Sequence, residues 1–186
     1  VRFAAQLNFE IEPATFAALK TNAAKIKRIS AERVRDELIK LFAPPTDWNA
    51  GLQRGPQQAS QRAGSEFRTP AARGLELLRS SDLLEPILPE IAATVTCDQS
   101  PDFHPEGTVF QHLCLMLQQL PPDAHPSLPW AVLLHDVAKP VTASRDPQTG
   151  SIHFYEHEKI GAKMAESILE RLRFLSISGN NLDELF

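Results

Sequence analysis

Cysteine is scarce in this sequence, and long apolar runs are missing from it. Only Cys97 and Cys114 occur among 186 residues, and they form no Cys-x-x-Cys pair. This spacing excludes a zinc ribbon or a dithiol redox motif, and it favours two buried, reduced thiols over a disulfide. No stretch approaches the roughly 20 consecutive apolar residues of a membrane span. We therefore expect a cytoplasmic protein with no membrane partner.

Strand-like alternation is also rare, and its longest run is "SIHFY" at 151–155. Helical spacing dominates the remainder, which predicts an all-α fold. One helix is expected to begin at Pro13, where a first turn tolerates proline. Others are expected after the N-cap residues Ser30 and Thr108, and over 157–174. Residues 74–91 predict a short helix, a turn at two serines, and a second apolar helix broken by prolines.

The segment 44–73 differs from both of its neighbours. It is rich in Pro, Gly, Gln and Ser and has few apolar side chains. We predict a flexible insertion there, between helices at 1–43 and a second helical part at 74–186. The net charge of −4 is uneven, since residues 1–43 carry +3 and residues 87–186 carry −7. The start and end of the sequence lead us to expect a piece of a longer protein.

Histidines supply the main functional signal. His112, inside the helix predicted at 108–120, and His157, which precedes Ile160 and Met164 at helical spacing, both lie on core-facing stripes. His135 and Asp136 directly follow the apolar run Trp130–Leu134. Burying a carboxylate is costly unless a partner offsets its charge, and a divalent metal bound by imidazole and carboxylate would do so. Such an ion can activate water for attack on phosphorus.

Simpler interpretations stand beside this metal site. A single inward-facing histidine is more often a hydrogen-bonded core residue than a ligand. His125 lies in a Pro-rich loop and is expected to face solvent, while His153 is either a neighbour of the ligands or without function. Lys139 is either a favourable charge at a helix end or a positive charge near the mouth of a catalytic site. Cys114 is expected to serve packing alone.

The motifs "FHPEGTVFQH", "LLHDVAKP" and "FYEHEKIGA" resemble the HD-domain superfamily of metal-dependent phosphohydrolases. More specifically, they resemble the HD domain of bacterial tRNA nucleotidyltransferases (CCA-adding enzymes) and poly(A) polymerases. The opening "VRFAAQLNFEIEPATFAAL" and "ISAERVRDELIKLF" resemble the neck region of the same family. The resemblance implies neck helices at 1–43, followed by linker helices and an HD helical bundle. No Gly-Ser sequence followed by Asp-x-Asp is present, so the nucleotidyltransferase head is missing.

The resemblance also implies roles for particular residues. His112, His135, Asp136 and His157 would bind a divalent metal, with Mn, Ni, Mg, Fe and Zn not distinguished. His135, Asp136 and Lys139 would serve catalysis, and Arg2 and Arg33 would face RNA and nucleotide. The superfamily takes a last Asp from a later helix, for which Asp183 is one candidate and a residue past Phe186 another.

The parent enzyme implied by this family uses ATP or CTP on an RNA 3′ end, with tRNA as the expected partner. CCA addition and polyadenylation are not distinguished. Two alternatives stay open for this chain. One is an RNA-binding support module with a non-catalytic HD domain. The other is a free-standing HD phosphohydrolase acting on cyclic or nucleotide phosphoesters, for which a neck would have no use.

Overall fold

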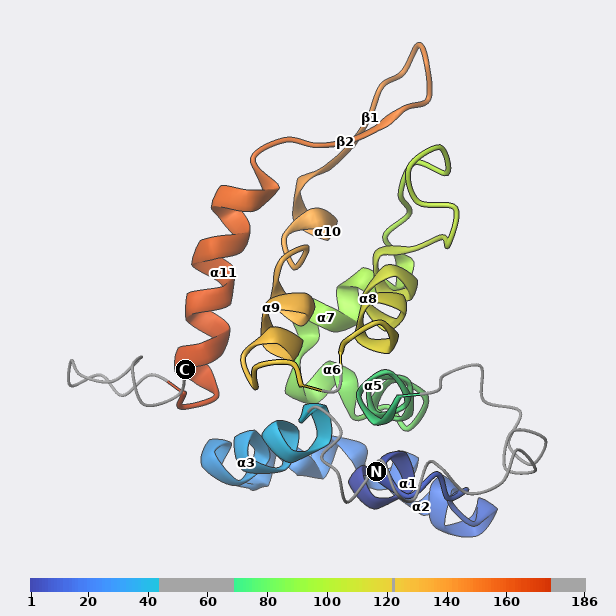
Figure 1. Cartoon of the computed structure of the whole chain (residues 1–186), viewed down its shortest axis with the longest axis vertical. Coiled ribbons are helices and arrows are strands. Elements are labelled where there is room, and N and C mark those ends of the chain that lie inside the picture. The colour runs from blue at the N-terminus through green and yellow to red at the C-terminus, as the bar shows by residue number, and fades with distance from the viewer. Residues whose placement is uncertain (44–68, 122, 175–186) are drawn as a thin grey trace.

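The computed structural model describes residues 1–43, 69–121 and 123–174, and it confirms the all-α fold class. Helices form nearly all of the regular structure in these ranges, and one two-stranded hairpin is added to them. In Figure 1 the N-terminal helices form one end of the molecule and the hairpin projects from the opposite end. The remaining helices lie between these two ends.

The N-terminal end contains four helical segments. They are α1 (Arg2–Gln6), α2 (Pro13–Asn22), the 3-10 helix η1 (Ala23–Arg28) and α3 (Ala31–Phe42). Pro13 is the first residue of α2, as predicted, and the Glu12 side chain accepts hydrogen bonds from the backbone N–H groups of Ala14 and Thr15. Ser30 occupies the N-cap position of α3, although its side chain makes no capping hydrogen bond.

Helix α5 (Pro70–Ser80) begins inside the segment predicted as a loop. Thr69 caps it by accepting from the backbone N–H of Ala72, and the residues of its first turn, 70–73, are buried. The loop interpretation therefore does not hold for 70–73, because α5 packs against both α1 and α3. Residues 44–68 lie outside the described residues. The predicted domain boundary at residue 74 falls within this helix.

The helices after α5 build the second part. They are α6 (Leu84–Ile87), α7 (Pro89–Ala93), the 3-10 helix η3 (Thr94–Thr96), α8 (Val109–Gln118) and α9 (Leu128–Leu134). Thr108 caps α8 in a reciprocal capping box with Gln111, which confirms the predicted start of this helix. The fully buried core side chains include Leu75, Leu88, Ile91, Leu113, Leu117, Leu133 and Ile168.

A short hairpin separates the last two helical stretches. Helix α10 (Lys139–Thr142) is followed by β1 (Ala143–Arg145), β2 (Ile152–Phe154) and α11 (His157–Arg171). The strands pair antiparallel, with Ser144 opposite His153. The "SIHFY" run therefore contains β2. Within the described ranges, no helix is both long enough and apolar enough to cross a membrane.

Candidate metal site

The carboxylate of Asp136 is the buried centre of the site. It lies one residue beyond His135, which ends helix α9, and its side chain is only 5% exposed. One oxygen, Oδ2, lies 3.1 Å from His135 Nε2 and 2.8 Å from Lys139 Nζ. The other oxygen, Oδ1, lies 3.7 Å from His157 Nε2. Three cationic or imidazole groups thus surround the carboxylate that the sequence placed after an apolar helix.

Three histidines in this region each have the nitrogen Nδ1 engaged. His135 Nδ1 lies 2.8 Å from the Val132 carbonyl oxygen, and His157 Nδ1 lies 2.8 Å from the Phe154 carbonyl oxygen. Because a carbonyl only accepts, Nδ1 must carry a hydrogen in both rings. His112 Nδ1 lies 2.6 Å from Glu106 Oε1. In all three rings Nε2 remains as the atom that can ligate a metal.

The predicted ligands come together as the sequence suggested, although not all equally closely. Ligand atoms of His112, His135 and Asp136 lie within 4.8 Å of one another, and the rings of His112 and His135 are 5.7 Å apart. Two imidazole nitrogens and a carboxylate oxygen form a donor set that divalent transition metals accept. His157 lies outside this tight group, on the Oδ1 side of Asp136. The residues therefore fit a metal ion.

The electrostatics keep the site charged. Burial raises the pKa of Asp136, but the hydrogen bonds from His135 and Lys139 outweigh burial, and the resulting pKa lies well below its usual range. Burial lowers the pKa of His135, but its hydrogen bond and charge interaction with Asp136 outweigh burial and raise the pKa above its usual range. The carboxylate is therefore ionised at neutral pH, and His135 retains a proton more readily than a free histidine.

Lys139 is held more tightly than the sequence suggested. Its Nζ lies 2.8 Å from Asp136 Oδ2 and donates to Gln99 Oε1 at 2.7 Å, and its side chain is 9% exposed. It begins α10 and does not end a helix. The helix-end interpretation is therefore wrong, since Lys139 compensates Asp136 directly. Gln99 lies forty residues earlier in the chain, and no feature of the sequence indicated this contact.

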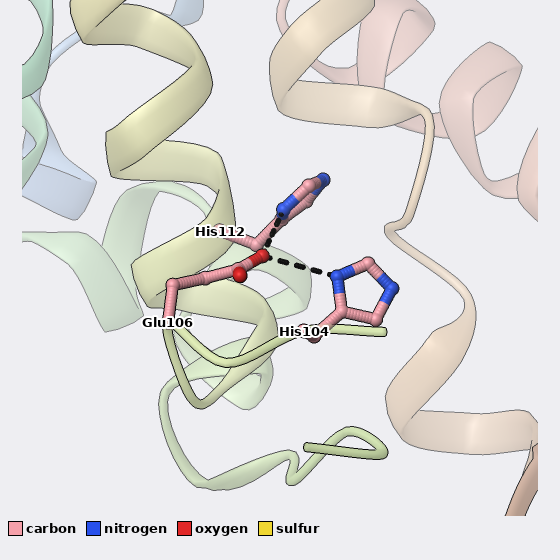
Figure 2. A group of neighbouring side chains, drawn as sticks. All are labelled: His104, Glu106 and His112. Carbon is pink, nitrogen blue, oxygen red and sulfur yellow. Dashed lines mark hydrogen bonds and ion pairs between the residues drawn. The ribbon is translucent and has the colours of Figure 1, made fainter. Parts of the chain in front are cut away.

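Sequence reasoning also missed Glu106 and His104. One oxygen of Glu106, Oε1, lies 3.0 Å from His104 Nδ1 and 2.6 Å from His112 Nδ1 (Figure 2). Burial raises the pKa of Glu106, but hydrogen bonds from its own backbone and from both histidines outweigh burial and lower the pKa to about 2. The available signal was the four-residue stretch "HPEG" directly before the N-cap Thr108, in which Pro and Gly indicate a turn.

The other candidate residues lie apart from this cluster. His153 is half-buried on β2 and stacks on the Tyr155 ring at 5.3 Å, and His125 is exposed and within hydrogen-bond distance of Ser127 Oγ, at 2.8 Å. Asp183 lies outside the described residues. Both cysteines are free and buried, as predicted, and burial raises the pKa of Cys114 to about 12.

The two arginines predicted to face RNA lie at the N-terminal end. Arg2 Nε donates to Glu37 Oε2 at 2.7 Å, and its guanidinium lies 4.2 Å from the centre of the Phe3 ring. Arg33 is exposed and makes no ion pair within the part of the chain that the structure describes. Arg33 precedes Glu37 by one helical turn, so it lies on the same side of α3 as the carboxylate that pairs with Arg2 of α1.

Comparison with known proteins identifies two modules. Residues 109–185 match the HD domain, and residues 8–50 match a family described as "Probable RNA and SrmB- binding site of polymerase A". The fold and site therefore define an HD-domain protein with an RNA-binding module of the polymerase A type. Both modules and the curated relatives make this chain similar to one part of the tRNA nucleotidyltransferases. The resemblance predicted from its motifs is confirmed.

Three relatives illustrate this similarity. The A-adding tRNA nucleotidyltransferase of Deinococcus radiodurans is 37% identical over 92% of this chain, and the CC-adding tRNA nucleotidyltransferase of Thermus thermophilus is 32% identical over 94%. The multifunctional CCA protein of an Azoarcus species is 31% identical over 92%. The chain spans 36% of the length of each relative. No solved structure matches the chain significantly.

Proposed function

We propose that this chain is the RNA-handling part of an RNA 3′-end nucleotidyltransferase and that its HD domain is a metal-dependent phosphohydrolase site. His112, His135 and Asp136 would hold one divalent ion. His157 lies beside the second carboxylate oxygen of Asp136, Oδ1. The observation that carries this proposal is the engagement of Nδ1 in three histidines around one buried carboxylate. This arrangement leaves Nε2 as the ligand atom of each ring, and His135 Nε2 would exchange its hydrogen bond with Asp136 Oδ2 for the ion.

Each residue then has a separate task. The bound ion supplies charge stabilisation and a more acidic water molecule. Asp136 provides the negative charge that attracts the cation. Lys139 offsets the remaining charge on Asp136 and keeps that carboxylate oriented through its contact with Gln99. His157, whose side chain is 31% exposed, would contact the phosphoryl group or complete the ligand set.

RNA, with the tRNA 3′ end as the expected partner, is the ligand proposed for the N-terminal module. The carrying observation is the basic, exposed Arg33 within the matched range 8–50. Neutralising a phosphate releases counterions, so each phosphate contact adds to the salt dependence of binding. Arg33→Gln should weaken tRNA binding and reduce the slope of log affinity against log salt by about one. Glu32→Gln, on the adjacent exposed residue, is the control that should not reduce it.

The metal-site proposal is tested by metal uptake and turnover. The wild-type chain, dialysed against Mn²⁺, Ni²⁺ or Zn²⁺, should retain an ion, and 2′,3′-cyclic AMP should be hydrolysed with added Mn²⁺, Ni²⁺ or Mg²⁺. His135→Ala should lower both occupancy and turnover. His125→Ala removes an exposed imidazole from a loop and should change neither. A wild type that takes up none of these ions would overturn the metal site.

One observation favours a second function. Asp136 already has Lys139 at 2.8 Å, so a cation compensates the carboxylate within the protein itself. A carboxylate that is already compensated does not require a catalytic ion, which is compatible with an HD domain that supports RNA without catalysis. Metal uptake without hydrolysis by any of the three metals would favour this support module over the hydrolase.

A further inference from the structure

Glu106 is shared between two histidines through a single oxygen. Its Oε1 accepts from His104 Nδ1 at 3.0 Å and from His112 Nδ1 at 2.6 Å, and the two rings stand 4.9 Å apart and nearly perpendicular. Figure 2 shows each ring turning its second nitrogen away from the carboxylate. All three side chains are half-buried, at 18–26% exposure. This cluster adjoins the proposed ligands, because His112 belongs to both groups.

The chain builds this contact with two local devices. The first is a turn at 104–107, closed by a 3.1 Å hydrogen bond from Gly107 N–H to the His104 carbonyl, with Pro105 at its second position. Gly107 has φ +110°, a conformation that disfavours other residues. The second device is the capping box that begins α8. Together they fold Glu106 back onto His112, one turn into the helix.

We propose that Glu106 is a positioning residue for the metal site, acting through His112. By accepting from Nδ1–H it fixes the tautomer and the ring orientation, so that Nε2 is the ligand atom. This inference rests on the proposed metal-binding function. A carboxylate partner on the far nitrogen also makes the ligating nitrogen more basic. Loss of such a partner typically costs about 10–100-fold in metal affinity.

The distances favour positioning over direct ligation by this cluster. Two ligands that bind one ion at about 2.1 Å, at angles of 90° or more, stay about 3 Å or further apart. The 2.6 Å between His112 Nδ1 and Glu106 Oε1 is shorter than that limit and is typical of a charge-assisted hydrogen bond. His104 is then a second donor to Glu106 and not a ligand.

The experiment compares metal affinity at one fixed pH, by calorimetry with Ni²⁺ and by the visible absorption of bound Co²⁺. Glu106→Ala should bind 10–100-fold more weakly, with the wild-type stoichiometry of one ion and an altered Co²⁺ spectrum. Glu106→Gln should lose less affinity, because its amide oxygen still accepts a hydrogen bond. His104→Asn should bind one ion with near wild-type affinity. The matched control is Glu76→Gln, which changes a carboxylate of similar exposure that is paired with Arg79.

The outcomes separate this inference from the proposed function. If Glu106→Ala binds like wild type while His135→Ala does not, the metal site stands and the positioning role is overturned. If the wild type binds two ions and His104→Asn loses one, the cluster is itself a metal site, which also overturns it. If the wild type binds no ion, both proposals fall. If circular dichroism shows that Glu106→Ala does not fold, the metal affinity of Glu106→Gln is compared with that of the wild type instead.

Discussion

Replacing Asp136 by alanine should destabilise the metal-free protein strongly, because the change leaves Lys139 buried without its counter-charge. The two charged atoms are 2.8 Å apart, and the side chains are 5% and 9% exposed. At an effective dielectric constant of about 20, their gross attraction is about 6 kcal/mol. Removing one partner of a buried pair typically costs about 3–5 kcal/mol, which is a large share of the stability of a domain.

The second variant in this test is the double substitution Asp136→Ala with Lys139→Met. It removes both charges and keeps most of the side-chain volume, so it should recover most of the lost stability. It should not recover all of it, because Gln99 loses the donor to its Oε1 and has an unpartnered buried Nε2 already. An unsatisfied buried polar group costs about 1–3 kcal/mol.

The assay is equilibrium unfolding by urea at pH 7 with a chelator present. Asp36→Ala is the control, since Asp36 is 51% exposed and its pair with Arg35 should contribute no more than about 1 kcal/mol. The reasoning is refuted if Asp136→Ala costs less than 1 kcal/mol, or if the double variant is as unstable as the single one. The result also matters for interpreting activity, because an inactive Asp136→Ala protein could simply be unfolded.

Three further predictions concern other parts of the structure. His135 must lose the proton on Nε2 to bind a metal, and its pKa is raised. As the pH is lowered from 8, metal affinity should therefore start to decrease before the pH reaches 6.5, the usual pKa of histidine. A calorimetric affinity that is constant between pH 8 and pH 6 would contradict this. Gly107→Ala should lower both metal affinity and the unfolding midpoint, because φ is +110° there and a Cβ would clash with Gln111 Oε1. Gly150→Ala, in an open turn, should leave metal affinity unchanged. Arg73→Met should cost about 1.5–3 kcal/mol in urea unfolding, since it removes donors to Asn8 and to the Phe9 carbonyl. A cost below 0.5 kcal/mol would refute the role of Arg73 in joining the residues that follow α1 to α5.

Much of the fold could be predicted from local signals. Pro13 and the Thr108 capping box mark helix starts through backbone chemistry that acts within four residues, and both were confirmed. The start of α5 was missed although Thr69 and Pro70 give the same kind of local signal, an N-cap residue followed by proline. Ala71 and Ala72 look unremarkable in a Gln- and Ser-rich segment, and they become helical core because α5 packs on α1 and α3. The burial of these alanines depends on that tertiary contact, which local periodicity does not encode.

The candidate site shows the same difference between local and tertiary signals. The sequence alone predicted that His112, His135, Asp136 and His157 would lie near one another, and the structure places the three histidines around Asp136, with His135 exposed beyond the last residue of α9. The partners that set their protonation could not be found that way. Lys139 reaches Gln99 across forty residues, and Glu106 acts from a turn whose shape depends on Gly107. Periodicity predicts which side of a helix faces inward, whereas hydrogen-bond partners depend on how loops close around it.

The protein groups that contact the site residues also predict whether the chain stays folded when the metal is removed. A structural zinc site unfolds without its ion, because the ion alone neutralises its ligands. Here Lys139 and His135 already lie beside the Asp136 carboxylate, and the Nδ1 atoms of His112, His135 and His157 are satisfied by the protein itself. The metal-free chain should therefore stay folded, with unchanged circular dichroism after chelation. Added ion at 100 times its dissociation constant should stabilise the chain by about 2.7 kcal/mol, through binding linkage alone. Unfolding on chelation would show instead that the ion holds the helices together and that Lys139 does not compensate Asp136.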